Sequence, residues 1–168
     1  MIDYRGCRTR LVYAIGASLC CVVLANGQAA PPTALSAALR ARVKDDRFEI
    51  VTSIRGLPLG VRDELQTLFG TSTLDIAEPG AEFRITDKIT NQQLPSRRLV
   101  AAGCSIAYCL VHYERGGSSH TWHVALFHWT PAATTFEWGG TAPGGLATIA
   151  DVRNAVLSGT VKGPAGFW

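Results

Sequence analysis

The spacing of apolar residues in the first half of the chain predicts helices. Between residues 34 and 47 the sequence is rich in Ala, Leu and Arg, a composition that favours a helix. A second helix is predicted because four apolar residues recur at the spacing of one helical face: Val61, Leu65, Leu68 and Phe69. Asp63 and Glu64 are expected in its first turn, where the helix dipole favours anions, and Gly70 is placed to end it.

From residue 81 the apolar period changes to two, which predicts strands. Phe83 and Ile85 alternate with charged neighbours, the pattern of a half-exposed strand. Further strands are predicted over residues 97–103, 110–115, 120–129 and 136–138. Residues 47–55 are ambiguous, because their β-branched residues favour a strand while their apolar residues recur every three positions.

The connections between these elements carry turn and cap signals. Gly116-Gly117 predicts a two-residue hairpin turn, and the strand that follows is apolar on both faces, which places it centrally in a sheet. Residues 139–145 are rich in Gly and Pro and are expected to form a loop. Thr148 and Asp151 then form a capping-box pattern at the start of a final helix.

The order of these elements predicts an α+β fold. We expect a central antiparallel sheet of about five strands, packed by N-terminal and C-terminal helices. Residues 47–168 are expected to form a single α+β domain, preceded by a leader and N-terminal helical segment over residues 30–46.

The first 29 residues have the pattern of an export signal. Positive charge near the start comes from three arginines: Arg5, Arg8 and Arg10. An apolar run of about 15 residues follows, and Gly27 and Ala29 are the small residues that favour cleavage after Ala29. The alternative is a retained membrane anchor, but a span needs about 20 apolar residues. We therefore expect a signal peptide over residues 1–29, a periplasmic or secreted protein, and no stable membrane insertion after cleavage.

Composition narrows the class of the mature protein. About 140 residues remain after cleavage, the usual size of one domain. The formal charge falls from +3 to about +1, because three arginines and one aspartate leave with the signal. No Lys/Arg cluster survives beyond Arg97-Arg98, so a nucleic-acid partner is not expected. No phosphate-loop or nucleophile-elbow motif is present, so we expect neither a cofactor nor an enzyme.

The four histidines lie within one predicted hairpin. With a two-residue turn, His112 pairs with Thr121, and His123 lies diagonally beside His112 on the same face. Two histidines on adjacent strands can hold a metal ion, but a zinc site usually needs three or four ligands, and no carboxylate is placed to complete it. We expect the rings to pack among aromatic residues; a metal or enzymatic site at His112 and His123 is the alternative.

Cys104 and Cys109 are the two cysteines that remain after cleavage. Close cysteines in an oxidising compartment form a disulfide by default, and this pair would close a small ring between two strands. One interpretation is a staple, which contributes roughly 2 kcal/mol by closing the loop. The other is a preorganised binding tip that loses little entropy on binding, with Ile106 and Tyr108 as anchors. Four residues would be presented by the ring: Ser105, Ile106, Ala107 and Tyr108.

Three motifs follow one another in a recognisable layout. They are Gly56-Leu57-Pro58 before a short helix ending at Phe69-Gly70, Cys104-x4-Cys109 after a strand, and Phe136-Glu137-Trp138-Gly139 before the last helix. From Arg47 to Gly159 this layout resembles the inhibitor-of-vertebrate-lysozyme (Ivy) family, small periplasmic proteins that plug the active-site cleft of lysozymes. The resemblance implies an α+β sandwich with a central antiparallel sheet. It also implies a disulfide-closed binding loop and a lysozyme-like or other peptidoglycan-cleaving enzyme as protein partner.

The loop departs from that family at two positions. The family's loop carries a histidine that reaches the enzyme's catalytic carboxylates, and Ala107 occupies that position here. Tyr108 stands where an acidic residue is usual. Because a methyl group cannot hydrogen-bond a carboxylate, inhibition by this chain must either use another tip residue or be weak. We therefore expect an exported, non-enzymatic binding protein that presents the Cys104–Cys109 ring to a protein partner. The alternatives are a small metal-binding or enzymatic protein that uses His112 and His123, or an envelope protein of unrelated function.

Overall fold

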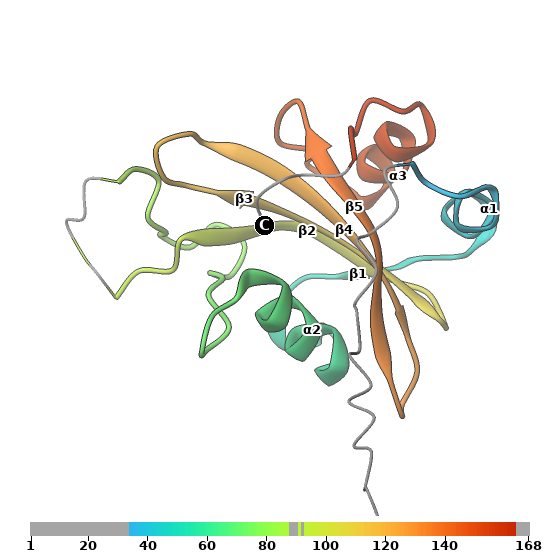
Figure 1. Ribbon diagram of the computed structural model, residues 1–168, viewed down its shortest axis with the longest axis horizontal. Helices are drawn as coiled ribbons and strands as arrows, with labels where there is room; N and C mark the ends of the chain where they lie inside the picture. The colour runs from blue at the N-terminus through green and yellow to red at the C-terminus, as the bar shows by residue number, and fades with distance from the viewer. Residues whose placement is uncertain (1–33, 88–90, 92, 164–168) are drawn as a thin grey trace, which may run out of the picture.

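The computed structural model describes residues 34–87, 91 and 93–163, so the expected signal peptide over residues 1–29 lies outside the described residues. The described chain forms a five-stranded antiparallel sheet in which strands adjacent in sequence are also adjacent in space (Figure 1). The strands are β1 Glu49–Val51, β2 Arg97–Cys104, β3 Tyr108–Arg115, β4 Thr121–Trp129 and β5 Thr134–Ala142. β3 is the middle strand, and β1 and β5 are the edges of an open sheet.

Helices cover both faces of the sheet. α2 lies on one face, and α1 and α3 lie together on the other (Figure 1). The helices are α1 Ala37–Asp45, the short 3-10 helix η1 Ile54–Gly56, α2 Leu59–Phe69 and α3 Ile149–Leu157. Within the described ranges, no helix combines the length and the apolar composition that crossing a membrane requires.

The sheet separates two hydrophobic cores. Leu65 of α2 shares the first core with Tyr113 of β3 and with other residues of β3 and β4. On the opposite face, Val43 of α1 and Val152 of α3 share a second core with Leu110 of β3. β3 and β4 therefore bury side chains on both faces, as the apolar sequence of β4 predicts.

The predicted α+β class is confirmed, and so are the predicted end of α2 at Gly70 and the predicted cap of α3 at Thr148. The helix expected over residues 34–47 is α1, which begins after a Ser36 cap. α2 ends at Gly70, whose φ of 66° is a left-handed conformation that glycine adopts without steric cost. α3 begins with a capping box, because Thr148 and Asp151 each accept a hydrogen bond from the other's backbone N–H.

The strand predicted at Phe83 and Ile85 does not form, and β1 supplies the fifth strand instead. Phe83 is buried, with the Arg98 guanidinium 4.6 Å from its ring centroid, whereas Ile85 is 51% exposed. The alternation therefore marks the inner and outer sides of an irregular segment. Its backbone bonds to a loop, since the Ile85 carbonyl accepts a hydrogen bond from the Gly117 N–H at 3.0 Å.

Two predicted boundaries also need correction. α2 begins at Leu59 and has no acidic residue in its first turn, so Asp63 and Glu64 lie further along the helix. β5 continues to Ala142, because its backbone pairs with β4 along that stretch. The predicted loop over residues 139–145 is therefore shortened to the residues that follow β5.

Gly116 tests how the segment containing Ile85 packs on the β3–β4 hairpin. A Cβ at Gly116 would lie 2.7 Å from the Ile85 Cα and would clash with the Arg84 carbonyl. Gly116→Ala is therefore expected to lower the free energy of unfolding by about 2 kcal/mol, measured by urea denaturation. Gly144→Ala is the matched control, because nothing lies within 4 Å of its added Cβ. Equal stability of the two variants would contradict this packing.

Candidate binding site

The predicted ring closes between the end of β2 and the start of β3. Cys104 and Cys109 are cross-strand partners with Cα atoms 4.1 Å apart, and their sulfurs lie 2.06 Å apart as a disulfide. Cys109 is fully buried in the core beneath α2. The disulfide thus sits against the core, while the loop of residues 105–107 projects at the end of the sheet (Figure 1).

Ser105 turns inward and organises the loop. Its side chain is buried, and its hydroxyl donates a hydrogen bond to Asp46 Oδ2 at 3.0 Å. The same oxygen accepts hydrogen bonds from the N–H of Tyr108 at 3.0 Å and of Ala107 at 3.4 Å. The Ser105 N–H also donates to the Tyr108 carbonyl at 2.6 Å. The prediction that Ser105 is presented at the tip is therefore wrong. Its side chain points into the turn, where its hydroxyl accepts hydrogen bonds from two backbone N–H groups.

Trp129, the last residue of β4, holds the other side of the loop. Its indole N–H donates to the Ser105 carbonyl at 3.2 Å, and its backbone N–H donates to the Ala107 carbonyl at 2.9 Å. The Tyr108 ring packs on His128, with centroids 5.1 Å apart. The loop is consequently fastened to the end of α1 through Ser105 and to β4 through Trp129.

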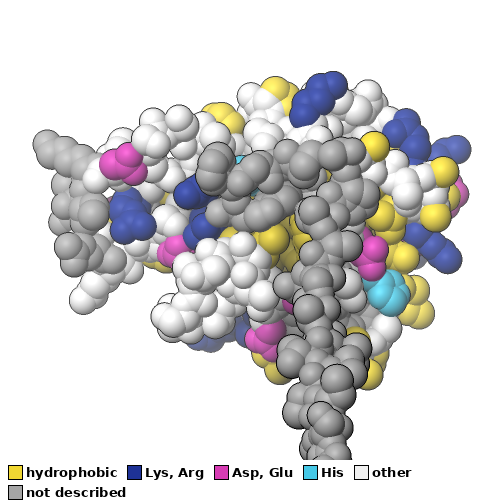
Figure 2. Space-filling model, viewed as in Figure 1, with side chains coloured by type: hydrophobic (Ala, Val, Ile, Leu, Met, Phe, Trp, Pro, Cys, Tyr) yellow, Lys and Arg dark blue, Asp and Glu magenta, His cyan; other side chains and the backbone are white. Residues whose placement is uncertain are grey.

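Ile106 is the residue that the loop exposes. Its side chain is 94% exposed, whereas Ala107 and Tyr108 are half-buried. Figure 2 shows that hydrophobic side chains gather at the end of the molecule where the two hairpins project. Burying an isoleucine gains roughly 2 kcal/mol, and a turn that is already ordered adds little entropic cost. The tip therefore presents one apolar anchor rather than four side chains.

Sequence reasoning missed the two residues that support the loop, Asp46 and Trp129. Asp46 lies 59 positions before Ser105, so no local pattern links the two residues. Trp129 could have been found from the sequence only weakly. A partly buried indole at the end of an apolar strand needs a hydrogen-bond acceptor, which indicates that some nearby loop supplies one.

Replacing either cysteine of the disulfide is expected to lower the stability of the protein by the same amount. Cys104→Ser and Cys109→Ser should each lower the free energy of unfolding by about 2 kcal/mol, because each opens the same short ring. Reduced wild-type protein is the control and should match both variants. Titration of exported wild-type protein with a thiol reagent is expected to find no free thiol; two reactive thiols would show that the ring does not close.

The histidine pair expected on one face is separated by the sheet. Arg115 pairs with Thr121, so a loop of five residues, rather than a two-residue turn, joins β3 to β4. His112 then lies opposite Val124 and not Thr121, and His123 lies one position away on the other face. The shared metal site considered at His112 and His123 is therefore contradicted by the register. Among the described residues no group of three His, Cys, Asp or Glu side chains is placed to hold a metal.

His112 fastens the loop that leads into α3. Its Nδ1 lies 2.9 Å from the His123 carbonyl, and its Nε2 accepts a hydrogen bond from the Leu146 N–H at 3.0 Å. These two bonds require a neutral ring that carries its proton on Nδ1. Burial lowers the pKa of His112, which agrees with the neutral form.

His123 is buried on the α2 face of the sheet. Its ring stacks on Tyr113 with centroids 5.3 Å apart, and its Nε2 lies 2.8 Å from the Thr121 hydroxyl. Burial, together with the positive charges of Arg115 and Arg97, lowers the pKa of His123 to about 4. His123 is thus a neutral ring packed in the core.

These buried histidines predict a loss of stability in mild acid. Their folded-state pKa values lie below the unfolded value, so the unfolded chain binds protons that the folded protein does not. The contribution of these two histidines to the free energy of unfolding is therefore fully present above about pH 6.5. It is lost as the pH falls towards their folded-state pKa values. Between about pH 7 and pH 5, His123 alone should cost about 2 kcal/mol, measured by urea denaturation at each pH. In His123→Gln the loss should be smaller by that amount; an equal loss would contradict the assignment.

Glu114 is part of a buried charge network with Arg98 and His120. Its Oε1 accepts a hydrogen bond from Arg98 Nε at 2.6 Å, and its Oε2 lies 2.7 Å from His120 Nε2. The His120 ring in turn packs on Trp122, with centroids 4.4 Å apart. These contacts offset the cost of removing the Glu114 carboxylate from water, since the residue is almost fully buried.

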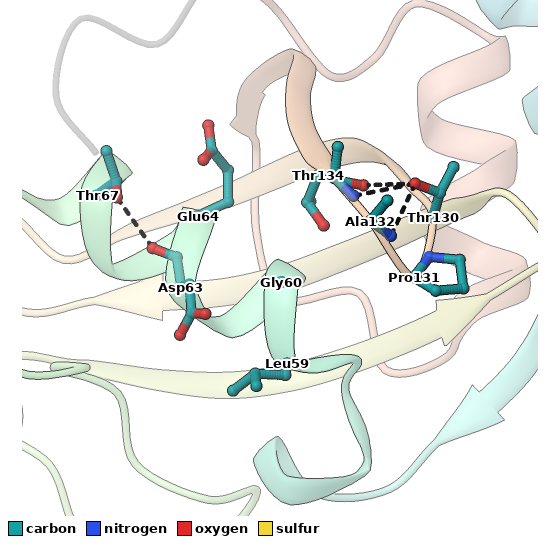
Figure 3. A pocket seen from close by; sticks show the side chains of 10 residues that line it. Leu59, Gly60, Asp63, Glu64, Thr67, Thr130, Pro131, Ala132 and Thr134 are labelled. Atoms are coloured by element: carbon teal, nitrogen blue, oxygen red, sulfur yellow. Dashed lines mark hydrogen bonds between the residues drawn. The ribbon is translucent and has the colours of Figure 1, made fainter.

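A groove of about 370 Å³ opens beside the loop, between α2 and the turn that joins β4 to β5 (Figure 3). One wall consists of α2 residues Leu59, Gly60, Asp63, Glu64 and Thr67, and the other of residues 130–134. Gly60 allows the close approach, since a Cβ there would lie 3.2 Å from the Thr134 Cβ. The Thr130 hydroxyl accepts hydrogen bonds from the N–H groups of Ala132 and Ala133, which holds the turn in one shape. No local sequence pattern indicates this groove, because its two walls are far apart in the chain.

Comparison with protein-family models, with curated proteins and with solved structures finds no match to this chain. The resemblance to the Ivy family therefore stays a prediction that rests on the motifs quoted above. What the loop can do follows from its own geometry: a fixed turn that carries one exposed isoleucine beside a polar groove.

Proposed function

We propose that the mature protein is an exported, non-enzymatic binding protein that inserts Ile106 into a pocket of a protein partner. The observation that carries this proposal is the near-complete exposure of Ile106 on a turn whose polar groups are satisfied beneath it. An isoleucine in water contributes no packing to the folded monomer, whereas burial in a partner's pocket makes it an anchor.

The partner that we propose is a peptidoglycan-cleaving enzyme of the lysozyme type. The layout of the loop resembles that of the Ivy family, and a narrow projecting loop suits a cleft better than a flat surface. Ala107 is half-buried and carries only a methyl group, so the position that carries the family's histidine offers no hydrogen bond to a carboxylate here. Ile106 would then occupy the cleft, and inhibition would act by obstruction rather than by a hydrogen bond to catalytic carboxylates.

Inhibition assays with purified mature protein against a panel of lysozymes and lytic transglycosylases test this proposal. We expect inhibition of at least one enzyme. Ile106→Ala should weaken it at least about tenfold, because truncating a central anchor costs 1.4 kcal/mol or more. Ile85→Ala is the matched control, since it removes the same atoms from another exposed isoleucine and should leave inhibition unchanged.

Two results would count against the proposal. The absence of inhibition and of binding across the whole panel at high micromolar concentration would remove the enzyme partner. Equal weakening by Ile106→Ala and Ile85→Ala would remove Ile106 as the anchor.

A further inference from the structure

Two arginines lie opposite each other at the end of the sheet away from the disulfide ring. Arg97 of β2 and Arg115 of β3 are cross-strand partners, and like charges in directly opposite positions repel. Arg97 is almost fully buried, and its Nη1 lies 2.7 Å from Asp75 Oδ2. Burial lowers the pKa of Arg97, and the charge of Arg115 acts in the same direction. The two guanidinium groups are therefore close enough to interact.

Arg115 has no counter-ion in the described part of the chain. Its side chain is half-buried, and it forms neither an ion pair nor a side-chain hydrogen bond with any described residue. Burial lowers the pKa of His123, and the charge of Arg115 contributes to the same shift, so this charge also acts within the core. A guanidinium that is partly removed from water and lies beside another cation is stabilised by an anion.

The Tyr113 hydroxyl is a second group without a partner at the same place. Tyr113 and Arg115 are two positions apart on β3, so their side chains lie on the same face of the sheet. The Tyr113 side chain is fully buried, and its hydroxyl makes no hydrogen bond with the described residues. Burial raises the pKa of Tyr113, while the charges of Arg97 and Arg115 act in the opposite direction because they lie near the hydroxyl. The hydroxyl therefore stays protonated and is a buried donor without an acceptor.

A carboxylate matches both of these groups. The planar fork of a guanidinium pairs with the two oxygens of a carboxylate, and the same oxygens have further lone pairs that accept a hydrogen bond from a hydroxyl. One guanidinium without a counter-ion is balanced by one negative charge, which a carboxylate carries and a phosphate monoester exceeds.

We propose that Arg115 and Tyr113 form a binding site for a small organic carboxylate. Arg115, the more exposed of the two side chains, forms the bidentate ion pair, and Tyr113 donates a hydrogen bond to the same carboxylate. Arg115 lies at the opposite end of β3 from the ring, roughly 20 Å from Cys109 along the strand. The site is therefore separate from the Ile106 loop, and it does not depend on the function proposed for that loop.

NMR titration of the mature, isotopically labelled protein with N-acetylglycine tests the site. The Arg115 Nε–H signal and the backbone amide signals of Tyr113 and Arg115 are expected to shift, with a dissociation constant on the order of 1 mM to 10 mM. N-acetylglycinamide, which lacks the negative charge, should leave these signals unmoved, and so should sodium chloride at the same ionic strength. Equal shifts with the amide or with chloride would overturn the proposal.

Arg115→Gln should bind N-acetylglycine at least about tenfold more weakly, because it removes the charge and the fork. Arg55→Gln is the matched control, since Arg55 is exposed and is not among the charges that act on Tyr113, and it should bind like wild type. Thermal unfolding of each variant checks that the fold is kept. Unchanged binding by Arg115→Gln would contradict the assignment.

Tyr113→Phe tests the hydroxyl without disturbing the packing of the ring. Because the hydroxyl has no partner in the free protein, the variant should unfold at the same urea concentration as wild type or at a higher one. It should nevertheless bind N-acetylglycine about tenfold more weakly, because a hydrogen bond to a charged group is lost. Binding like that of wild type would remove Tyr113 from the site.

Ile106→Ala separates this proposal from the function of the loop. The variant should bind N-acetylglycine like wild type, because Ile106 lies in the loop at the other end of β3. Weaker binding by Ile106→Ala would contradict a separate site. Binding of N-acetylglycine together with a panel that shows no inhibition supports the carboxylate site and removes only the enzyme partner.

Discussion

Burial of β3 on both of its faces is the constraint from which the rest of this structure follows. Every residue from Cys109 to Glu114 is buried, with alternate side chains directed into the α2 core and into the core beneath α1 and α3. A shift of one residue would exchange the two sets, so the register of β3 is strongly specified. The residue at which β3 begins is thereby fixed, and with it the position of the loop that precedes it.

The register of β3 sets where the loop lies, and hydrogen bonds within and beside the loop set its shape. Ser105 supplies an inward hydroxyl, and Trp129 supplies two donors from the neighbouring strand. The disulfide closes the same turn, but it joins the strand ends rather than the tip. We attribute the shape of the tip mainly to these hydrogen bonds, because they hold the residues on either side of Ile106.

Local sequence patterns predicted correctly those features that depend on residues close together in the chain. Gly70 and the Thr148 capping box fixed two helix ends, and the spacing of Cys104 and Cys109 located the loop. Long-range packing explains the misses. Phe83 alternates like a strand residue, yet it is buried by contacts with Arg98 that no local pattern encodes.

The turn of the β3–β4 hairpin and the direction of Ser105 were both predicted wrongly, because each depends on a hydrogen bond to a residue distant in sequence. The Gly116 N–H bonds to the Ser96 carbonyl, outside the hairpin, so Gly116-Gly117 does not close a two-residue turn and the histidine faces change. Within the loop, the inward direction of Ser105 depends on Asp46, which follows α1. A spacing of cysteines can indicate a loop, but it does not indicate which of its side chains faces water.

The central claim is that Ile106 is held on a rigid turn before any partner binds. Backbone ¹⁵N relaxation of the oxidised mature protein measures this directly at residues 105–108. The account predicts order parameters near 0.85, equal to those of the sheet. Values below about 0.6 would show a mobile loop and would contradict a preorganised anchor.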